Sequence, residues 1–263
     1  MLIFKNISDN PNKLILLDVF SYSCMNCLRS LGYIKQLDKK YNRYGLKTIL
    51  IHPPEWSFEK KEENIFNVLK KHKIRFPIIT DKNKKIIKRL GIGFWPAQVL
   101  IKNNKILYKH IGEGNYKNLE EKIRSLLRIK QKKVFSSEPR YSKLPAIYLG
   151  KRKRGKVKFL KENIRFGIVY KKGKWIQTDE YLQHIGKNGS LTILTKWNVI
   201  NFTASPVNNK AAIVSVKLDD GFNKKLVINN PDLYEIAKIK ENKMHKLTIS
   251  TKSRAKIYSF SFQ

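Results

Sequence analysis

Cysteine is scarce in this chain: only two of its 263 residues are cysteines, Cys24 and Cys27. A disulfide-stapled secreted domain needs several pairs, so these two cannot be the framework of the fold. A zinc site would need two further Cys or His ligands, and the five histidines are scattered along the chain. Covalent haem attachment needs a histidine directly after the second cysteine, where Leu28 stands. The sequence therefore predicts no metal and no cofactor, and it leaves the pair as either a chemical site or two buried cysteines that are close by chance.

Long apolar runs are absent as well. No stretch of about 18 apolar residues occurs, so no segment has the pattern of a membrane-spanning helix. Residues 1–10 contain Lys5 but no apolar core of a signal peptide, and a polar stretch follows them. The sequence alone thus predicts a cytoplasmic chain.

Acidic residues are few: 20 Asp and Glu stand against 55 Lys and Arg, a net charge of +35. Eleven of the basic residues, with a single Glu, lie between Gly150 and Trp175. Such a field attracts acidic proteins, anionic membranes or nucleic acid. No single-strand or major-groove motif accompanies the basic run, so nucleic acid is disfavoured. We expect an acidic partner or an anionic surface for the C-terminal half, and general lysine enrichment of the chain is the alternative.

The length and the apolar patterns predict two domains. In the first half, apolar runs alternate with helical periodicity, which is typical of an α/β sheet with helices on its faces. The expected strands are 14–20, 46–51, 76–80 and a hairpin of 97–102 with 105–111 around Asn103-Asn104, whose residues tolerate positive φ. The expected helices are 24–44, 57–71, 83–90 and 116–129, with Phe58, Ile65, Phe66 and Leu69 on the inner face of the second.

The pattern changes after Lys130. Residues 131–144 are polar and predict a linker. Beyond them, short alternating runs separated by turn residues predict an all-β antiparallel, jelly-roll-like sandwich. Its expected strands are 175–177, 191–194, 199–204, 212–218, 225–228, 246–250 and 256–262. The predicted organisation is a first domain over 1–130, a linker over 131–144 and a second domain over 145–263.

The two cysteines follow a predicted strand and open a predicted helix. The sulfur of Cys24 would lie near unpaired backbone N–H groups and the positive end of the helix dipole, which favours its thiolate. Cys27, one turn later, is placed to attack a mixed disulfide formed by Cys24 and release the reduced substrate. This pattern predicts an enzyme, a thiol–disulfide oxidoreductase in which Cys24 attacks protein disulfides and Cys27 resolves the intermediate.

Several segments resemble a known family in order and spacing. They are Leu-Leu-Asp-Val-Phe at 16–20, Ser-Cys-Met-Asn-Cys-Leu-Arg at 23–29, His-Pro-Pro-Glu-Trp-Ser-Phe-Glu at 52–59, Phe-Trp-Pro-Ala at 94–97 and Gly-Glu-Gly-Asn-Tyr at 112–116. Together they resemble the thioredoxin-like domain of DipZ-type thiol–disulfide oxidoreductases, within the TlpA- and ResA-like part of the thioredoxin superfamily. Residues 145–150, 232–236 and 255–262 more loosely resemble the carbohydrate-binding-module-like β-sandwich that follows that domain in the family. Sugar binding does not follow from this, since lone strand aromatics such as Trp175 and Trp197 are more often core.

The resemblance implies roles for individual residues. Asp18, six residues before Cys24, is the implied acceptor of the Cys27 proton, with a strand-edge carboxylate as the alternative. Pro96 matches the family's cis-proline beside the disulfide, which leaves the preceding backbone open to an extended substrate segment. The candidate substrate-binding residues are Ser23, Phe94 and Trp95. The resemblance also implies protein substrates, a membrane or soluble electron-donor protein, and a location outside the cytoplasmic membrane.

Two departures from the family leave the direction of electron flow open. Ser23 stands where many thioredoxins have Trp, and Met25-Asn26 replaces Gly-Pro between the cysteines; both positions influence reduction potential. An alternative function is a redox-sensing binding module whose sandwich and basic face recruit a protein, glycan or anionic-surface partner. His52, Glu55 and Glu59 match the family segment, and we predict turn formation and packing for them.

Overall fold

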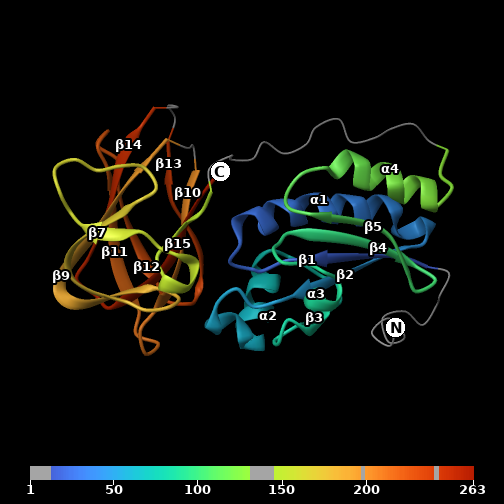
Figure 1. The fold of residues 1–263 in the computed structure, drawn as a ribbon, viewed down its shortest axis with the longest axis horizontal. Coiled ribbons are helices and arrows are strands. Elements are labelled where there is room, and N and C mark those ends of the chain that lie inside the picture. Colours follow the sequence, from blue (N-terminus) through green and yellow to red (C-terminus); the bar gives the residue numbers. More distant parts are fainter. Residues whose placement is uncertain (1–12, 131–144, 197–198, 240–242) are drawn as a thin grey trace. The chain divides into compact units, whose positions relative to one another are not determined.

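The computed structural model describes residues 13–130, 145–196, 199–239 and 243–263 (Figure 1). The chain divides into two compact units, Met1–Arg140 and Tyr141–Gln263. The predicted linker at 131–144 lies outside the described residues, and the exact domain bounds stay a prediction. In the described ranges, no helix is long and apolar enough to cross a membrane.

The first unit is built on a five-stranded mixed sheet in the order β3-β2-β1-β4-β5. Strands β1, β2 and β3 are parallel, whereas β4 runs antiparallel to both β1 and β5. The strand bounds are β1 Leu14–Val19, β2 Leu46–His52, β3 Ile78–Thr80, β4 Ala97–Lys102 and β5 Lys105–Ile111. The predicted thioredoxin-like α/β fold is confirmed in this unit.

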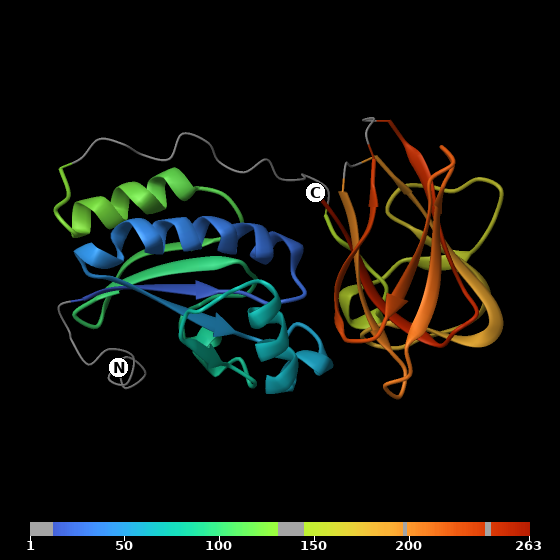
Figure 2. The ribbon, with the colours of Figure 1, turned by 180° about the vertical axis from the view of Figure 1, so that it is seen from behind.

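Four α-helices cover the two faces of the sheet. They are α1 Met25–Tyr41, α2 Glu62–Lys71, α3 Lys85–Arg89 and α4 Tyr116–Leu126, with short 3-10 turns at η1 Asn42–Tyr44 and η2 Ser57–Lys60. Figures 1 and 2 show α1 and α4 together on one face and α2 and α3 on the other. Both faces of β1 are therefore covered, which explains why all six of its residues are buried.

The helix predicted over 57–71 is broken, and one predicted inner residue is wrong. Backbone in an extended conformation at Lys61 (φ −82°, ψ 117°) separates η2 from α2. The helical register therefore begins again after Lys61, and it turns Phe66 outward, where 53% of its surface is exposed. Val68 packs inward in its place, beside Ile65 and Leu69.

The predicted hairpin is confirmed. Strands β4 and β5 have the predicted bounds and pair around Asn103 and Asn104, whose φ angles are 50° and 58°. Both residues are thus in the left-handed region that asparagine tolerates better than most side chains do.

The second unit is all-β, as predicted. Its strands form one ten-stranded sheet along the path β12-β11-β14-β9-β15-β10-β13, with β6, β7 and β8 attached at the side. The ends of this path, β12 and β13, lie close to each other, so the sheet curls around a single core. The strand bounds are β6 Ile147–Tyr148, β7 Val157–Phe159, β8 Val169–Gln177, β9 Leu182–Thr195, β10 Val199–Pro206, β11 Ala212–Leu218, β12 Asn223–Ile228, β13 Asp232–Lys238, β14 His245–Thr251 and β15 Ala255–Phe262.

One strand pair of this unit departs from the expected antiparallel pattern: β7 pairs with β8 in parallel. Strand β11 shows how the core forms. Its alternate residues Ala212, Val214 and Val216 are buried, whereas Ile213 lies on the other face and is 54% exposed. Trp175 is buried against the ring of His184, so it is a core residue. Trp197 lies outside the described residues.

Candidate functional site

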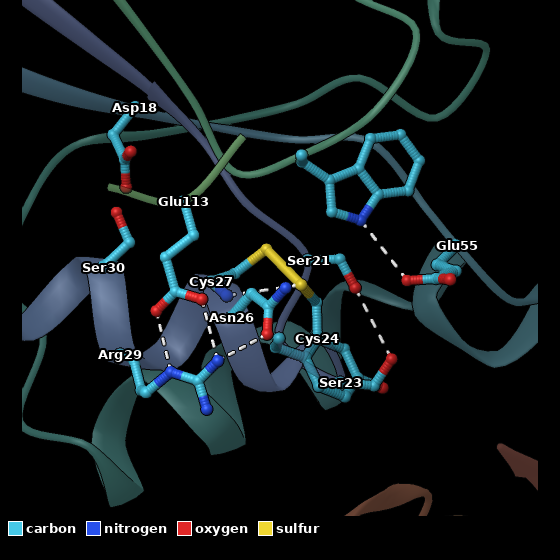
Figure 3. Close-up of a disulfide and its surroundings, with 12 residues drawn as sticks. Asp18, Ser21, Ser23, Cys24, Asn26, Cys27, Arg29, Ser30, Glu55 and Glu113 are labelled. Atoms are coloured by element: carbon cyan, nitrogen blue, oxygen red, sulfur yellow. Dashed lines mark hydrogen bonds and ion pairs between the residues drawn. A yellow bond between two sulfur atoms is a disulfide. The ribbon is translucent and has the colours of Figure 1, made fainter. Parts of the chain in front are cut away.

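The two cysteines form a disulfide at the start of α1 (Figure 3). Cys24 is the N-cap residue, and its Sγ accepts the backbone N–H of Cys27 at 3.3 Å. Their Cα atoms are 5.2 Å apart. Cys27 is completely buried, whereas Cys24 is partly exposed. Only the first sulfur is therefore open to an incoming partner.

The local sequence favours negative charge on that sulfur. The N-terminal N–H groups of a helix have no partners within the helix, and they carry the positive end of its dipole. The first turn of α1 contains no acidic residue that would oppose this effect. A thiolate at Cys24 would accept the same N–H donor that its sulfur accepts in the disulfide.

Asp18 is the penultimate residue of β1 and is fully buried. Burial raises the pKa of its carboxyl group from 3.8 to about 7, although a hydrogen bond from Gln98 opposes the rise. That bond joins Gln98 Nε2 on β4 to Asp18 Oδ1 at 2.9 Å, and Asp18 Oδ2 has no hydrogen-bond partner among the described residues. Figure 3 shows Asp18 and Ser30 pointing toward each other, and Ser30 is one helical turn after Cys27. The carboxyl group can thus exchange a proton near neutral pH.

The peptide bond between Trp95 and Pro96 is cis, as the resemblance implies. The N–H of Gly112 donates to the Pro96 carbonyl at 2.8 Å, which holds this loop beside the end of β5. The indole N–H of Trp95 donates to Glu55 at 3.3 Å, and Figure 3 shows Glu55 among the residues around the disulfide. Phe94 is 61% exposed, so it is accessible to a partner.

A buried ion pair that sequence reasoning missed lies next to the cysteines. Arg29 donates from Nε and one terminal nitrogen to the two oxygens of Glu113, both at 2.7 Å, and both side chains are 5% exposed. The same guanidinium donates to Asn26 Oδ1 at 2.6 Å. Arg29 thereby joins the turn between the cysteines to the loop after Gly112. The pairing spans 84 residues, so no local pattern could have revealed it.

Glu59 is buried beside the turn that precedes Cys24, and its hydrogen bonds add detail to the predicted role in turn formation and packing. Its carboxylate is buried and accepts hydrogen bonds from Ser21 Oγ at 2.7 Å, Ser23 Oγ at 2.5 Å and the Ser23 N–H at 3.3 Å. It also accepts the Glu55 N–H at 2.5 Å. Burial raises the pKa of Glu59, and these hydrogen bonds oppose the rise.

His52 ends β2 and lies against the aromatic rings of Phe20 and Tyr22. Burial lowers the pKa of its imidazole to about 4, so His52 is neutral near pH 7. This placement agrees with the predicted packing role. Across the described ranges, no group of three or more His, Cys, Asp or Glu side chains is arranged to hold a metal ion.

Comparison with known proteins finds similarity in the first part of the chain. Residues 5–125 match the family model described as Redoxin. The chain is 33% identical over 116 residues to Protein DipZ of Mycobacterium tuberculosis, which covers 44% of this chain and 17% of DipZ. It is 30% identical over 115 residues to Thiol-disulfide oxidoreductase ResA of Bacillus cereus, which covers 43% of this chain and 64% of ResA.

Other relatives are larger or more distant. Protein SUPPRESSOR OF QUENCHING 1, chloroplastic, of Arabidopsis thaliana is 28% identical over 120 residues, which are 45% of this chain and 11% of that protein. The chain therefore spans a small part of DipZ and of this plant protein, and less than two thirds of ResA. Among solved structures, StoA from Bacillus subtilis matches with 18% identity and a TM-score of 0.38, over 43% of this chain and 84% of StoA.

Proposed function

From the Redoxin domain over residues 5–125 and the disulfide at the start of α1, we propose that this chain is a thiol–disulfide oxidoreductase acting on disulfides of other proteins. The observation that carries the proposal is the unequal exposure of the two sulfurs. The pair combines an accessible Cys24 at a helix N-terminus with a fully buried Cys27. A nucleophile needs access and a favoured thiolate, whereas a resolving thiol needs only to reach the first sulfur.

In the reducing direction, the Cys24 thiolate attacks one sulfur of a substrate disulfide. A mixed disulfide forms, the substrate S–S bond breaks, and the other substrate sulfur leaves as a thiolate that takes up a proton. Cys27 then loses its proton and attacks the Cys24 sulfur, which releases the second substrate thiolate. The substrate gains two electrons, and the protein returns to the Cys24–Cys27 disulfide. A dithiol donor protein must reduce this disulfide again, and we propose such a donor as a partner.

The site residues receive proposed roles in this cycle. Asp18 accepts the Cys27 proton, supported by its burial, its raised pKa and its oxygen without a hydrogen-bond partner among the described residues. Pro96 keeps the backbone at Trp95 available for pairing with an extended substrate segment, supported by the cis peptide bond. The exposed ring of Phe94 supports substrate contact, and Trp95 is a further proposed substrate-binding residue. Ser23 is buried and its hydroxyl donates to Glu59, so the structure offers no support for the predicted substrate contact of its side chain.

Trapping the intermediate tests this function. Cys27→Ser should accumulate a mixed disulfide with a substrate protein that was denatured, reduced and then reoxidised. The mixed disulfide is seen as a band on a non-reducing gel that disappears when a thiol reductant is added. Cys24→Ser should give no such band, because the buried Cys27 cannot reach the substrate. Equal trapping by both variants, or by neither, would contradict the proposed order of attack.

For the second unit we propose an anionic partner surface. Residues 151–154, all basic, are exposed, and Phe159 nearby in sequence is 68% exposed with Lys171 Nζ 4.7 Å from its ring centre. Basic side chains beside exposed apolar ones fit the charge and the hydrocarbon boundary of an anionic lipid surface. Single-stranded nucleic acid would instead use the aromatic faces as stacking platforms.

Vesicle binding tests this second proposal. Binding to phosphatidylglycerol vesicles should exceed binding to phosphatidylcholine vesicles. Lys158→Glu with Phe159→Ser should weaken it by about a hundredfold or more, because the variant loses an apolar anchor and reverses one charge. The matched control is Lys217→Glu with Ile213→Ser, which removes an exposed Lys and an exposed apolar residue on β11. Equal loss in both variants, or stronger binding to single-stranded DNA, would contradict the proposal.

A further inference from the structure

Glu59 connects three segments that surround the disulfide. It lies on η2 and accepts hydrogen bonds from both hydroxyl groups of the turn that precedes Cys24, those of Ser21 and Ser23. The Cys24 N–H donates to the Ser21 carbonyl at 3.1 Å, so this turn leads directly into the N-cap position. The conformation of the turn therefore sets where the attacking sulfur is held.

The same carboxylate reaches the opposite side of the site. It accepts the backbone N–H of Glu55, and the Glu55 side chain accepts the indole N–H of Trp95 at 3.3 Å. Trp95 is the residue before the cis-proline, where we propose that substrate binds. One buried side chain thus joins the turn that holds the nucleophile to the segment that carries the proposed substrate loop.

The cost of burying Glu59 is not offset by a basic partner. All four of its donors are neutral hydroxyl or backbone N–H groups, and no ion pair is present for it within the described residues. Removing a carboxylate from water is expensive, and hydrogen bonds to its charged form are the main compensation. Packing alone does not account for a buried acid here, since an apolar side chain of similar size would pack without that cost.

Glu120 provides a contrast within the same unit. It is also completely buried, but it accepts from Lys40 Nζ at 2.6 Å and from the hydroxyls of Tyr33 and Tyr41. All three partners lie on α1 beyond its first two turns, away from the cysteines at its start. Through these contacts Glu120 joins two helices.

We propose that Glu59 is a positioning residue for Cys24: its carboxylate fixes the Ser21–Ser23 turn relative to Glu55, and its charge sets how readily the Cys24 thiolate forms. This role rests on the proposed exchange reaction. The Glu59 carboxylate contacts Ser23, the residue before Cys24. Its negative charge opposes a second negative charge on the Cys24 sulfur, so it limits formation of the thiolate that the helix N-terminus favours.

The test compares Glu59→Gln with Glu120→Gln, each combined with Cys27→Ser so that Cys24 is the only thiol. The measured quantity is the pH midpoint of iodoacetamide alkylation, which requires no protein substrate. Glu59→Gln should lower the midpoint by about one unit, because it removes the nearby charge and keeps the side-chain volume. Glu120→Gln should leave it unchanged. Equal midpoints for the two variants, with only stability lowered, would overturn the role.

Ser21→Ala provides a second variant in case Glu59→Gln folds poorly. It removes one donor to Glu59 and keeps the charge, so the turn loosens while the electrostatic effect remains. With Cys27 present, Ser21→Ala should lower the kcat/KM of insulin-disulfide reduction by about tenfold through misplacement of Cys24. An unchanged kcat/KM would contradict positioning. Loss of trapping by the Cys27→Ser protein itself would instead contradict the proposed function, so the two failures are distinguishable.

Discussion

The two units differ in what they bury. Among the described residues, five acidic or arginine residues of the first unit are buried, Asp18, Arg29, Glu59, Asp81 and Glu120, and the side chain of Glu113 is also only 5% exposed. The buried polar groups of the second unit are hydroxyls, the Asn201 amide and the imidazoles of His184 and His245, with no carboxylate, lysine or arginine. Each buried charge costs stability unless its partners are well placed. Three of the five buried residues of the first unit, Asp18, Arg29 and Glu59, lie next to the cysteines or on the strand that precedes them.

This difference indicates where stability and chemistry reside. The second unit packs an apolar core between the layers of one curled sheet, as a domain selected for folding and recognition would do. The first unit buries Asp18, whose pKa is raised to about 7, on the strand that precedes the cysteines, an arrangement common where chemistry needs a proton acceptor near neutral pH. The comparison can be tested by changing core groups in each unit and measuring stability and activity separately.

Phe202→Ala should have the largest effect on stability. Phe202 is fully buried and stacks near Phe260, so the truncation should lower the free energy of unfolding of the second unit by about 4 kcal/mol. Because the units have separate cores, the kcat/KM of insulin-disulfide reduction should not change. Urea unfolding followed by near-UV circular dichroism, with the activity assay alongside, measures both. A parallel loss of activity would break the comparison.

Asp18→Asn should change the pH dependence of stability. Burial raises the folded-state pKa of Asp18 from 3.8 to about 7, so between these values the folded protein holds a proton that the unfolded chain has released. The free energy of unfolding therefore falls as pH rises through this window and levels off above it. Three units at 1.36 kcal/mol each give an upper bound of about 4 kcal/mol.

The measurement is the difference in unfolding free energy between Asp18→Asn and the parent protein at several pH values from 4 to 8. The variant should gain steadily over the parent as pH rises. His52, whose pKa burial lowers to about 4, has the opposite pH dependence, and taking the difference cancels it. Resolution of the mixed disulfide at pH 7 should be slower in the variant. A difference independent of pH would show that Asp18 is not a raised-pKa group.

Glu113→Gln should have an intermediate effect. It leaves the Arg29 guanidinium, whose side chain is 5% exposed, without its carboxylate partner, while the hydrogen bond to Asn26 stays possible. We expect a loss of about 2 kcal/mol in the first unit, toward the low end for a broken buried pair because Gln keeps one acceptor oxygen. Activity should fall as well, since Arg29 joins the turn between the cysteines to the loop beside Pro96. Urea unfolding and insulin reduction measure the two effects; lost stability with unchanged activity would limit this pair to a structural role.

Local patterns predicted much of the first unit and less of the second. The apolar run of β1 and the pair of strands around Asn103-Asn104 were predictable because each depends on neighbouring residues. The extended backbone at Lys61 was not, because tertiary packing breaks a continuous helical pattern there. In the second unit, β13 and the first half of β9 carry mixed polar and apolar residues, and their strand state depends on pairing across the sheet.

The site shows the same limit. The spacing of the cysteines was sufficient to predict that the pair lies at the start of one helix, where Cys24 is the N-cap residue and Cys27 is in the first turn. The serine partners of Glu59 and the carboxylate partner of Arg29 are 36 to 84 residues away in sequence. Charged residues in a local segment carry no signal of which distant donor they will meet. The long-range contacts of Glu59 and Arg29 form only in the folded domain, where the sheet brings the loops together.

Asn104→Ala and Asn209→Ala should give the smallest effects, and here the two units should agree. Asn103-Asn104 join the paired strands β4 and β5, Asn208-Asn209 lie inside the isolated antiparallel bridge of Val207 with Lys210, and all four asparagines have φ between 50° and 58°. Asn104 and Asn209 are exposed, so alanine removes no packing and costs only the left-handed backbone preference, about 1 kcal/mol in each unit. Glycine at the same positions should cost nothing, because it lacks the Cβ atom that strains the turn. Urea unfolding of the four variants measures this, and costs that differ by more than about 1 kcal/mol between the units would show that the contrast extends from the buried charges to the turns.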